Sequence, residues 1–210
     1  MIASLSAPET AEEKALVLAS ASSARAMILE RAGIPFVRDP ADVDEDALKT
    51  EFRRRNEPVE SAALALSQAK ALHVSKRRPG AFVIGADQML VCGGRWFDKP
   101  KDKNEARDHL LAMRGRSHEL ISGVCVARDG GVLWNHVETT VMTMIPFGDG
   151  FLKSYLEEAG PEVLESVGAY RLEGAGARLF ARIEGDYFTI LGLPLLPLLA
   201  FLREAGVIAV

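Results

Sequence analysis

The spacing of apolar positions predicts alternating strands and helices along this chain. The run ALVLA at 15–19 is short and apolar, as in a strand buried in a sheet, whereas apolar residues from Ser22 to Gly33 recur at helical spacing. Further helical patterns cover four stretches, at 59–76, 101–115, 149–159 and from near Pro194 onward. The order of strand, serine-rich turn and helix places a helix N-terminus directly after the first strand.

Two glycine pairs indicate β-hairpins. Strand-like runs within 81–100 enclose Gly93-Gly94, and longer runs within 117–144 enclose Gly130-Gly131, a pattern typical of tight two-residue turns. The segment 168–192 alternates short strand-like runs with glycines. Because hairpins join antiparallel strands, the sequence predicts a mixed α/β fold and excludes a purely parallel sheet.

The first hairpin also predicts which residues become neighbours. With its two glycines as the turn, Cys92 faces Arg95, and stepping outward Gln88 lies opposite Lys99. Asp87 then lies one residue beyond, at the open end of the ribbon. The register therefore brings Asp87 and Lys99 together despite their separation in sequence.

Length and composition indicate one compact unit. At 210 residues and 48% hydrophobic content, the chain can bury the larger part of its unfolded surface without disulfides. We expect a flexible extension at 1–14 and a single domain over 15–210, since no long linker separates the predicted elements. The two cysteines, Cys92 and Cys125, fall in strand-like runs and are expected to be reduced core residues.

Charge and hydropathy exclude several kinds of partner. The chain has 25 Lys+Arg against 29 Asp+Glu, and this net charge of -4 argues against a broad nucleic-acid footprint and against binding to anionic membranes. The N-terminal residues lack a basic region before an apolar stretch, and the longest apolar run, Ile190 to Leu202, is interrupted by glycine and proline. We therefore expect a cytoplasmic protein.

Serines and one arginine cluster between the first strand and the first helix. Backbone N–H groups at a helix N-terminus, hydroxyl groups and a guanidinium together suit a bound phosphate. The same serines can instead cap the helix for structural reasons. The members of this cluster are Ser20, Ser22, Ser23 and Arg25.

Acidic residues and lysines elsewhere add three further candidates. The carboxylates of Asp42–Asp46 can hold Mg²⁺ or form a solvated acidic loop. Asp87 follows an apolar strand, where either a reactive group or a turn residue is common. Lys70 on a helix and Lys99 before Pro100 are phosphate partners in one interpretation and surface charges in the other.

Several catalytic signatures are missing from the sequence. The four histidines lack metal-ligand spacing, and HExxH, CxxC, GxSxG and the Walker loop GxxxxGK[ST] do not occur. What is left is a set of cations, hydroxyls and acidic positions in the N-terminal half. This combination suits phosphoanhydride hydrolysis, in which catalysis consists mostly of positioning and charge neutralisation.

Taken in order, these segments resemble the Maf family of nucleotide pyrophosphatases. LASASSAR is similar to the family's opening LASxSPRR, and the matching continues to about Glu204 through VDE at 43–45, Lys70, GADQ at 85–88, DKP at 98–100, GRSHELISGVCV at 115–126, GAYRLEG at 168–174 and IEGDYFTILGLPL at 183–195. The resemblance implies an elongated, twisted mixed sheet with flanking helices and a central nucleotide-binding cleft. It also implies a divalent cation, Mg²⁺ or Mn²⁺, and a possible homodimer.

The resemblance assigns roles to individual residues. Contacts to the triphosphate are implied for Ser20, Ser22, Arg25, Lys70 and Lys99. Glu45 and Asp87 would serve the metal and the attacking water, with Asp87 as the proton acceptor. The chain departs from the family pattern at Ser23, where the family has proline, and at Ala26, where it has a second basic residue.

Three positions bear on the nucleobase. Family members of the dTTP and UTP class carry threonine after the catalytic aspartate and glutamine in the late glycine-flanked motif, whereas this chain has Gln88 and Glu173. A carboxylate at Glu173 can accept hydrogen bonds from two adjacent N–H donors of guanine and would repel the carbonyl oxygens of uracil or thymine. Ala24 stands where the methylguanine class has a tryptophan able to stack on the base. We expect 7-methyl-GTP or a related purine triphosphate to be preferred.

Three functional hypotheses follow. The first is a pyrophosphatase that cuts a modified or non-standard NTP to NMP and pyrophosphate, with a dTTP/UTP type as the alternative specificity. The second is a non-catalytic nucleotide-binding regulator of cell division, and the third is a generic α/β interaction module. The presence of both acidic positions and both lysines favours the enzyme, since a pure binder has no need to activate water.

Overall fold

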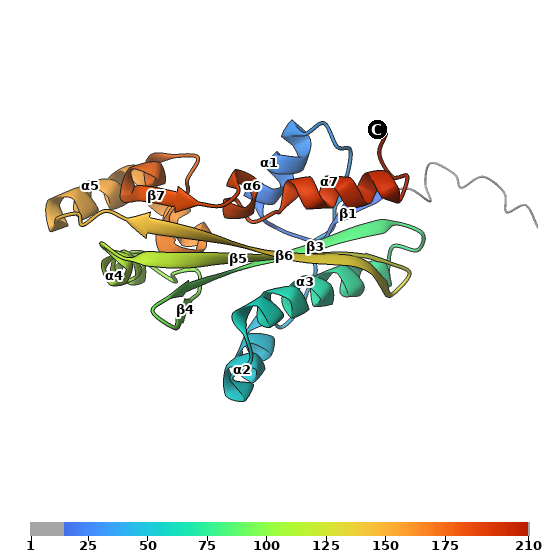
Figure 1. Ribbon diagram of the computed structural model, residues 1–210, viewed down its shortest axis with the longest axis horizontal. Coiled ribbons are helices and arrows are strands. Elements are labelled where there is room, and N and C mark those ends of the chain that lie inside the picture. The colour runs from blue at the N-terminus through green and yellow to red at the C-terminus, as the bar shows by residue number, and fades with distance from the viewer. Residues whose placement is uncertain (1–14, 210) are drawn as a thin grey trace, which may run out of the picture.

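A mixed seven-stranded sheet forms the centre of the molecule (Figure 1). The computed structural model describes residues 15–209, so the extension predicted at 1–14 lies outside the described residues. The sheet order is β2-β1-β3-β5-β6-β7, with β4 paired to β3. The strands are β1 (Leu16–Leu18), β2 (Val37–Arg38), β3 (Phe82–Cys92), β4 (Arg95–Phe97), β5 (Ser117–Arg128), β6 (Gly131–Met144) and β7 (Phe180–Glu184). Strand β1 runs parallel to β2 and β3 and the other pairs are antiparallel, which confirms the mixed sheet.

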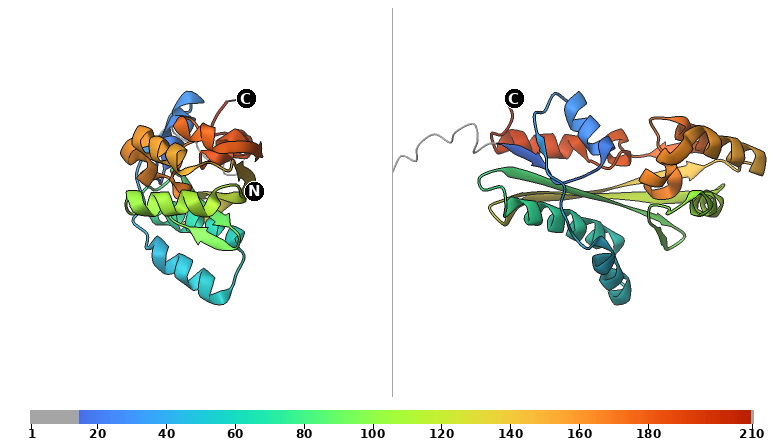
Figure 2. Two further views of the ribbon diagram at one scale, coloured as in Figure 1. Left: turned by 90° about the vertical axis from the view of Figure 1, so that its left-hand side faces the viewer. Right: turned by 180° about the vertical axis from the view of Figure 1, so that it is seen from behind.

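Helices flank both faces of this sheet. Figure 1 and Figure 2 show α1, α6 and α7 on one face and α2 and α3 on the other, while α4 and α5 gather with the 3-10 turns at one end. The long hairpin of β5 and β6 gives the molecule its elongated shape. The helices are α1 (Ser23–Arg31), α2 (Glu45–Arg55), α3 (Val59–Ser75), α4 (Lys103–Met113), α5 (Asp149–Ala159), α6 (Tyr187–Ile190) and α7 (Leu195–Glu204), and the 3-10 turns are η1 (Gly160–Glu165), η2 (Val167–Ala169) and η3 (Ala175–Leu179).

Strand β3 is flanked differently along its two edges. On one edge β5 pairs with it from Val83 to Val91. On the other edge β1 pairs with residues 82–84 and β4 pairs with residues 90–92, so in the described part of the chain the stretch 85–89 faces neither strand. Both β1 and β4 run toward this stretch and end there. The residues that follow these two strands therefore converge on the middle of β3.

Both predicted hairpins are present, but the turn of the second one lies one residue earlier than predicted. Cys92 pairs with Arg95, as predicted, and both Gly93 and Gly94 have positive φ. In the second hairpin the turn residues are 129–130 rather than Gly130-Gly131, because Arg128 pairs with Gly131. Asp129 supplies the first positive φ of that turn, which aspartate tolerates better than most residues.

Helix α3 packs against the sheet over two glycines. A Cβ added at Gly85 would collide with the backbone oxygen of Ser67, and one added at Gly123 would lie 2.5 Å from the backbone oxygen of Ala63. These glycines stand on adjacent strands and face the helix. Because they have no side chains, the α3 backbone approaches the sheet closely enough for Lys70 to reach across to β3.

Three local predictions from the sequence were wrong. Residues 42–46 do not form a loop throughout, because Asp44 caps α2 by accepting from the Ala47 amide and Glu45 begins the helix. Asp87 does not end a strand, because β3 continues through it to Cys92. The segment 168–179 forms turns and 3-10 helices, since consecutive backbone bonds there close within three residues.

The cysteines and the C-terminal apolar run are part of the folded core. Cys92 and Cys125 are free and buried, in agreement with their interpretation as core residues. Among the described residues, no helix combines the length and the apolar composition that crossing a bilayer requires. The apolar run at 190–202 is instead divided between α6, a turn and α7, whose residues pack in the main core.

The approach of α3 to the sheet gives a stability prediction. Gly85→Ala is expected to lower the free energy of unfolding by about 3 kcal/mol or more, because backbone atoms of α3 would have to move. Gly148→Ala is the control, since an added Cβ there meets no atom within 4 Å; its cost should stay below about 1 kcal/mol. Urea unfolding of both variants measures this difference, and equal costs would contradict the packing argument.

Candidate active site

The serine turn and α1 form one wall of the candidate site. Ser20 follows β1, is buried, and its hydroxyl accepts from the Ser22 amide at 3.2 Å and from Nη1 of Arg25 at 3.0 Å. Ser22 is the N-cap of α1, and its hydroxyl accepts from the Arg25 amide. The capping interpretation is confirmed for Ser22. Ser20 accepts from the Arg25 guanidinium, and phosphate binding by this cluster stays a prediction.

The C-terminal segment fixes Arg25 from the other side. The Nε of Arg25 donates to the Gly192 carbonyl at 2.8 Å. Gln88 anchors the same segment, since its amide nitrogen lies 3.0 Å from the carbonyl oxygens of Thr189 and Ile190. The Gln88 amide also lies 3.0 Å from the Ser122 hydroxyl on β5. Gln88 is predicted from the sequence to bind substrate. In the structure its amide nitrogen donates to the C-terminal segment and so helps to position Arg25.

A buried lysine joins the two candidate acidic residues. Lys70 extends from α3 and places its Nζ 2.6 Å from Oδ1 of Asp87 and 2.8 Å from Oε1 of Glu45. Asp87 is buried in the middle of β3, and its Oδ2 has no hydrogen-bond partner among the described residues. A carboxylate with one oxygen neutralised and the other unsatisfied is prepared to bind a further cation or a water.

Lys99 reaches the same cluster from the end of β4. It is exposed, and it lies two residues past the last ladder pair, Leu90 with Phe97, so it is not a cross-strand partner of Gln88 as the hairpin register had predicted. Its surroundings nevertheless include both acidic residues. Loss of solvation lowers the pKa of Lys99, Arg25 lowers it further, and Glu45 opposes that shift.

The charges of the cluster influence one another. Burial lowers the pKa of Arg25, and the nearby carboxylates of Asp87 and Glu45 offset part of that effect. Burial acts to raise the pKa of Glu45, but Lys70 outweighs it, so the net shift is downward. Glu45 is therefore held ionised beside the cations. Together these groups form a compact polar cluster at the uncovered stretch of β3.

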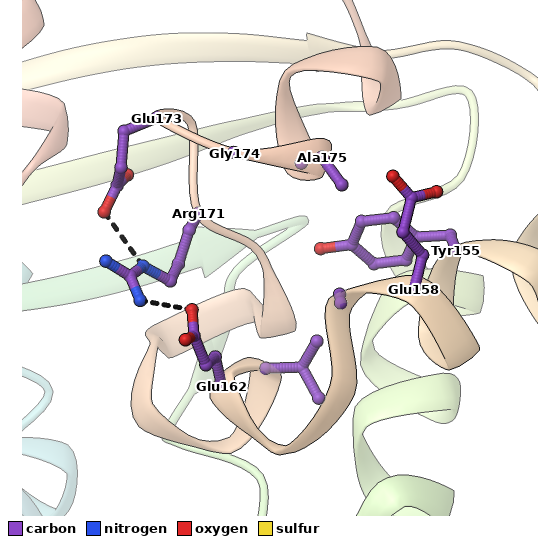
Figure 3. A pocket seen from close by; sticks show the side chains of 10 residues that line it. Tyr155, Glu158, Glu162, Arg171, Glu173, Gly174 and Ala175 are labelled. Carbon is purple, nitrogen blue, oxygen red and sulfur yellow. Dashed lines mark hydrogen bonds and ion pairs between the residues drawn. The ribbon is translucent and has the colours of Figure 1, made fainter.

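Glu173 lies in a different place. Its Oε1 accepts from Nε of Arg171 at 2.9 Å, and Arg171 also donates to Glu162 at 2.5 Å, as Figure 3 shows. These residues line a cavity of about 390 Å³ together with Tyr155 and Glu158 of α5. Within the described chain no hydrogen bond or ion pair joins Glu173 to the Asp87 cluster. The predicted base-recognising residue thus belongs to a polar group of its own, with Arg171 and Glu162.

Two site features escaped the sequence interpretation. Lys49 on α2 places its Nζ 2.7 Å from Oδ1 of Asp98, next to Lys99 in the chain. A lysine in a charged helix carries no local signal, and α2 itself was not predicted. The Gly192 carbonyl is a backbone group, which sequence motifs of side chains do not reveal. Ala24, the candidate for contact with the base, lies in the first turn of α1 and is half-buried.

The fold and the polar cluster around Asp87 together indicate a class of protein. A mixed α/β sheet brings an arginine, lysines and a half-satisfied buried carboxylate to one uncovered stretch of strand, which is an arrangement for binding a polyanion beside a potential base. The chain belongs to the Maf family: the family model described as Maf-like protein matches residues 15–205.

Curated relatives cover nearly the whole chain. A protein named nucleoside triphosphate pyrophosphatase from Paramagnetospirillum magneticum is 53% identical over 90% of this chain and 98% of its own length. A second protein of that name, from Granulibacter bethesdensis, is 53% identical over 90% of this chain and 96% of its own. A protein named 7-methyl-GTP pyrophosphatase from Mesorhizobium japonicum is 51% identical over 92% of this chain and 97% of its own.

The buried position of Lys70 leads to a prediction about stability. Lys70→Met leaves Asp87 and Glu45 without their shared cation and is expected to lower the free energy of unfolding by about 3–5 kcal/mol. Lys49→Met is the matched control. It should cost less than about 1 kcal/mol, because Asp98 is half-exposed and keeps Arg53 as a partner.

Urea unfolding of the two variants gives the comparison. The double variant Lys70→Met/Asp87→Asn should recover part of the loss, because a neutral amide needs no counter-charge. Equal stability of the two single variants would show that the Lys70 pair contributes nothing special to the fold.

Proposed function

We propose that this protein is a pyrophosphatase that hydrolyses a nucleoside triphosphate to NMP and pyrophosphate. The observation that carries the proposal is Asp87, which is buried, paired through one oxygen to Lys70, and left with its second oxygen free beside Arg25 and Lys99. The names of the Maf relatives support the same reaction. The runner-up, a non-catalytic nucleotide-binding regulator, has no use for such a carboxylate.

The proposed chemistry follows from the positions of these groups. A water oxygen attacks the α-phosphorus, its proton passes to Oδ2 of Asp87, and the bond from the α-phosphorus to the bridging oxygen breaks. Pyrophosphate leaves with the electron pair of that bond. Arg25 and Lys99 neutralise its growing charge, while Lys70 keeps Asp87 oriented.

A divalent cation fits the residues present. Asp87 presents an orphaned buried oxygen, and Glu45 adds a second carboxylate beside it on the same lysine. One or two carboxylates together with substrate phosphates are the ligands that Mg²⁺ usually takes in such sites. When bound, the ion would supply a Lewis acid that neutralises the triphosphate.

The proposed base preference rests on Glu173. Its carboxylate lines a cavity of a size that suits a base, and Arg171 holds it in place. A carboxylate accepts from the two adjacent N–H donors on the edge of guanine, so we propose a preference for 7-methyl-GTP or a related purine triphosphate. Ala24 offers no ring for stacking, so this preference depends on hydrogen bonds more than on aromatic contact. The cytoplasmic location and the homodimer stay predictions.

The role of Asp87 gives a catalytic prediction. Asp87→Asn should keep the fold, since the amide is isosteric, and lower turnover by about two to four orders of magnitude. The measurement is release of NMP and pyrophosphate from a panel of NTPs with Mg²⁺ or Mn²⁺, followed by chromatography.

Two controls accompany this measurement. Lys99→Ala should reduce turnover more than Lys101→Ala, because the charge of Lys99 interacts with Glu45 and Asp87, whereas Lys101 is an exposed residue two positions farther along the chain. Normal turnover in Asp87→Asn would remove its assignment as the base. Release of NDP and orthophosphate would mean that the reaction class is wrong, and nucleotide binding without hydrolysis would favour the regulator.

The role of Glu173 gives a specificity prediction. We expect wild-type kcat/KM to be higher for 7-methyl-GTP and GTP than for dTTP and UTP, and Glu173→Gln to reduce that ratio by about tenfold or more. Glu162→Gln is the matched control, because it also removes a carboxylate bound to Arg171 but is largely exposed. A wild-type preference for pyrimidines, or an unchanged ranking in Glu173→Gln, would refute this role.

A further inference from the structure

Helix α2 contributes a cation to the candidate site besides its carboxylate. Lys49 follows Glu45 by one helical turn, so the two side chains project from the same face of α2. The Lys49 side chain is only 12% exposed, and its Nζ lies 2.7 Å from Oδ1 of Asp98. Asp98 immediately precedes Lys99. Lys49 is therefore joined to the segment that follows β4 and carries Lys99.

The carboxylates around Lys49 belong to the site. Burial acts to lower the pKa of Lys49, but the hydrogen bond with Asp98 and the charges of Asp87 and Glu45 outweigh it, so the net shift is upward. Lys49 is thus a full cation within electrostatic reach of the proposed base. Arg53 lies one turn farther along α2; it shares Asp98 with Lys49 and also lies over the ring of Trp96.

The balance of charge shows what Lys49 adds. Among the described residues of the cluster, three carboxylates are present at Glu45, Asp87 and Asp98, and five cations at Arg25, Lys49, Arg53, Lys70 and Lys99. Lys49 therefore contributes one of the two positive charges by which the cations exceed the carboxylates. A triphosphate is strongly anionic, so a site that attracts it needs an excess of positive charge.

The partner of Lys49 is suited to release it. Asp98 is 45% exposed and is also bound by Arg53, whose Nη2 lies 3.2 Å from Oδ2. When Lys49 moves away, Asp98 keeps a cation and remains accessible to water, so the loss is small. The lysine stem is flexible and its ammonium carries three donors, which lets it exchange one anionic partner for another.

Helix α2 can also adjust without disturbing the core. None of its residues, all of which the structure describes, is fully buried. Its side chains reach the rest of the fold through the ion pairs of Glu45 with Lys70 and of Lys49 and Arg53 with Asp98, and through Arg53 over Trp96. The half-buried Leu48 adds apolar packing against a small cluster that includes Ala63 and Leu66. A helix that contributes no fully buried residue shifts at lower cost than a core helix such as α3.

We propose that Lys49 is a phosphate-binding residue of the candidate site. It pairs with Asp98 in the free protein, and its ammonium group moves from Asp98 to the pyrophosphate portion of the nucleotide when the nucleotide binds. This inference rests on the proposed function for the identity of its ligand. Lys99 and Lys49 then hold the departing group from two sides. Lys49 acts on binding more than on the chemical step, because its contacts with phosphate form in the ground state.

The test uses inorganic pyrophosphate and the full chain. Lys49→Met is expected to weaken pyrophosphate binding, measured by calorimetry with Mg²⁺ present, by about tenfold, the loss of one charge-assisted hydrogen bond. It should raise KM for the nucleotide with little change in kcat. Lys49→Arg should restore binding in large part, since the guanidinium also pairs with phosphate.

Arg53→Met is the matched control. It removes a cation from the same helix and the same Asp98 but leaves the acidic pair untouched, so we expect less than about a twofold change in pyrophosphate affinity. Thermal unfolding of each variant shows whether the fold is kept. Equal affinities of Lys49→Met and Arg53→Met, or a fall in kcat with unchanged KM, would overturn the role of Lys49.

The two proposals fail in different ways. Pyrophosphate binding that depends on Lys49, without release of pyrophosphate from any NTP in the wild type, would refute the proposed function and keep the phosphate role. Conversely, NTP hydrolysis that Lys49→Met leaves unchanged would support the proposed function and refute the phosphate role of Lys49. Absence of pyrophosphate binding in the wild type would overturn the phosphate role directly.

Discussion

The ion pair between Lys70 and Asp87 is the interaction on which the candidate site depends. A buried carboxylate is costly unless it is paired, and Lys70 pairs it at 2.6 Å while also binding Glu45. That contact exists because α3 lies almost directly on the sheet, over Gly85 and Gly123. This close approach of helix and sheet therefore lies at the point where the proposed chemistry takes place, and an alanine at either glycine would push α3 away from the sheet.

The second constraint is the stretch 85–89 of β3, which has no strand partner on one edge. Because β1 and β4 both end against residues 85–89, the turn after β1 delivers Ser20 and Arg25, and the turn after β4 delivers Asp98 and Lys99. The opposite edge of β3 is paired with β5 along its length from Val83 to Val91. Groups from both faces of the sheet can therefore meet at one place: Arg25 comes from the α1 face and Lys70 from the α3 face. A fully paired strand would keep them apart.

The parts of the site differ in how firmly they are held. Arg25 is fixed by Ser20 and the Gly192 carbonyl, and Lys70 is buried on the side of α3 that faces the sheet. Helix α2, which carries Glu45 and Lys49, is attached by ionic contacts and by the half-buried Leu48, and it has no fully buried residue. This contrast fits a site in which one wall is preorganised and the other adapts to an anionic ligand. The cavity at Glu173 is a separate element, built from α5 and the 3-10 turns.

The sequence by itself determined the periodic elements, the glycine hairpins and the family resemblance, because strand and helix spacing and tight turns are encoded locally. It located Ser20 after the first strand and Arg25 and Lys70 on their helices, and the pairing of Cys92 with Arg95 followed from the turn. Only the tertiary structure decided that Asp87 lies inside β3, that Gln88 holds the C-terminal segment, and that Lys49 joins the cluster. These features depend on contacts between residues far apart in the chain, and on where neighbouring strands stop, which local patterns do not contain.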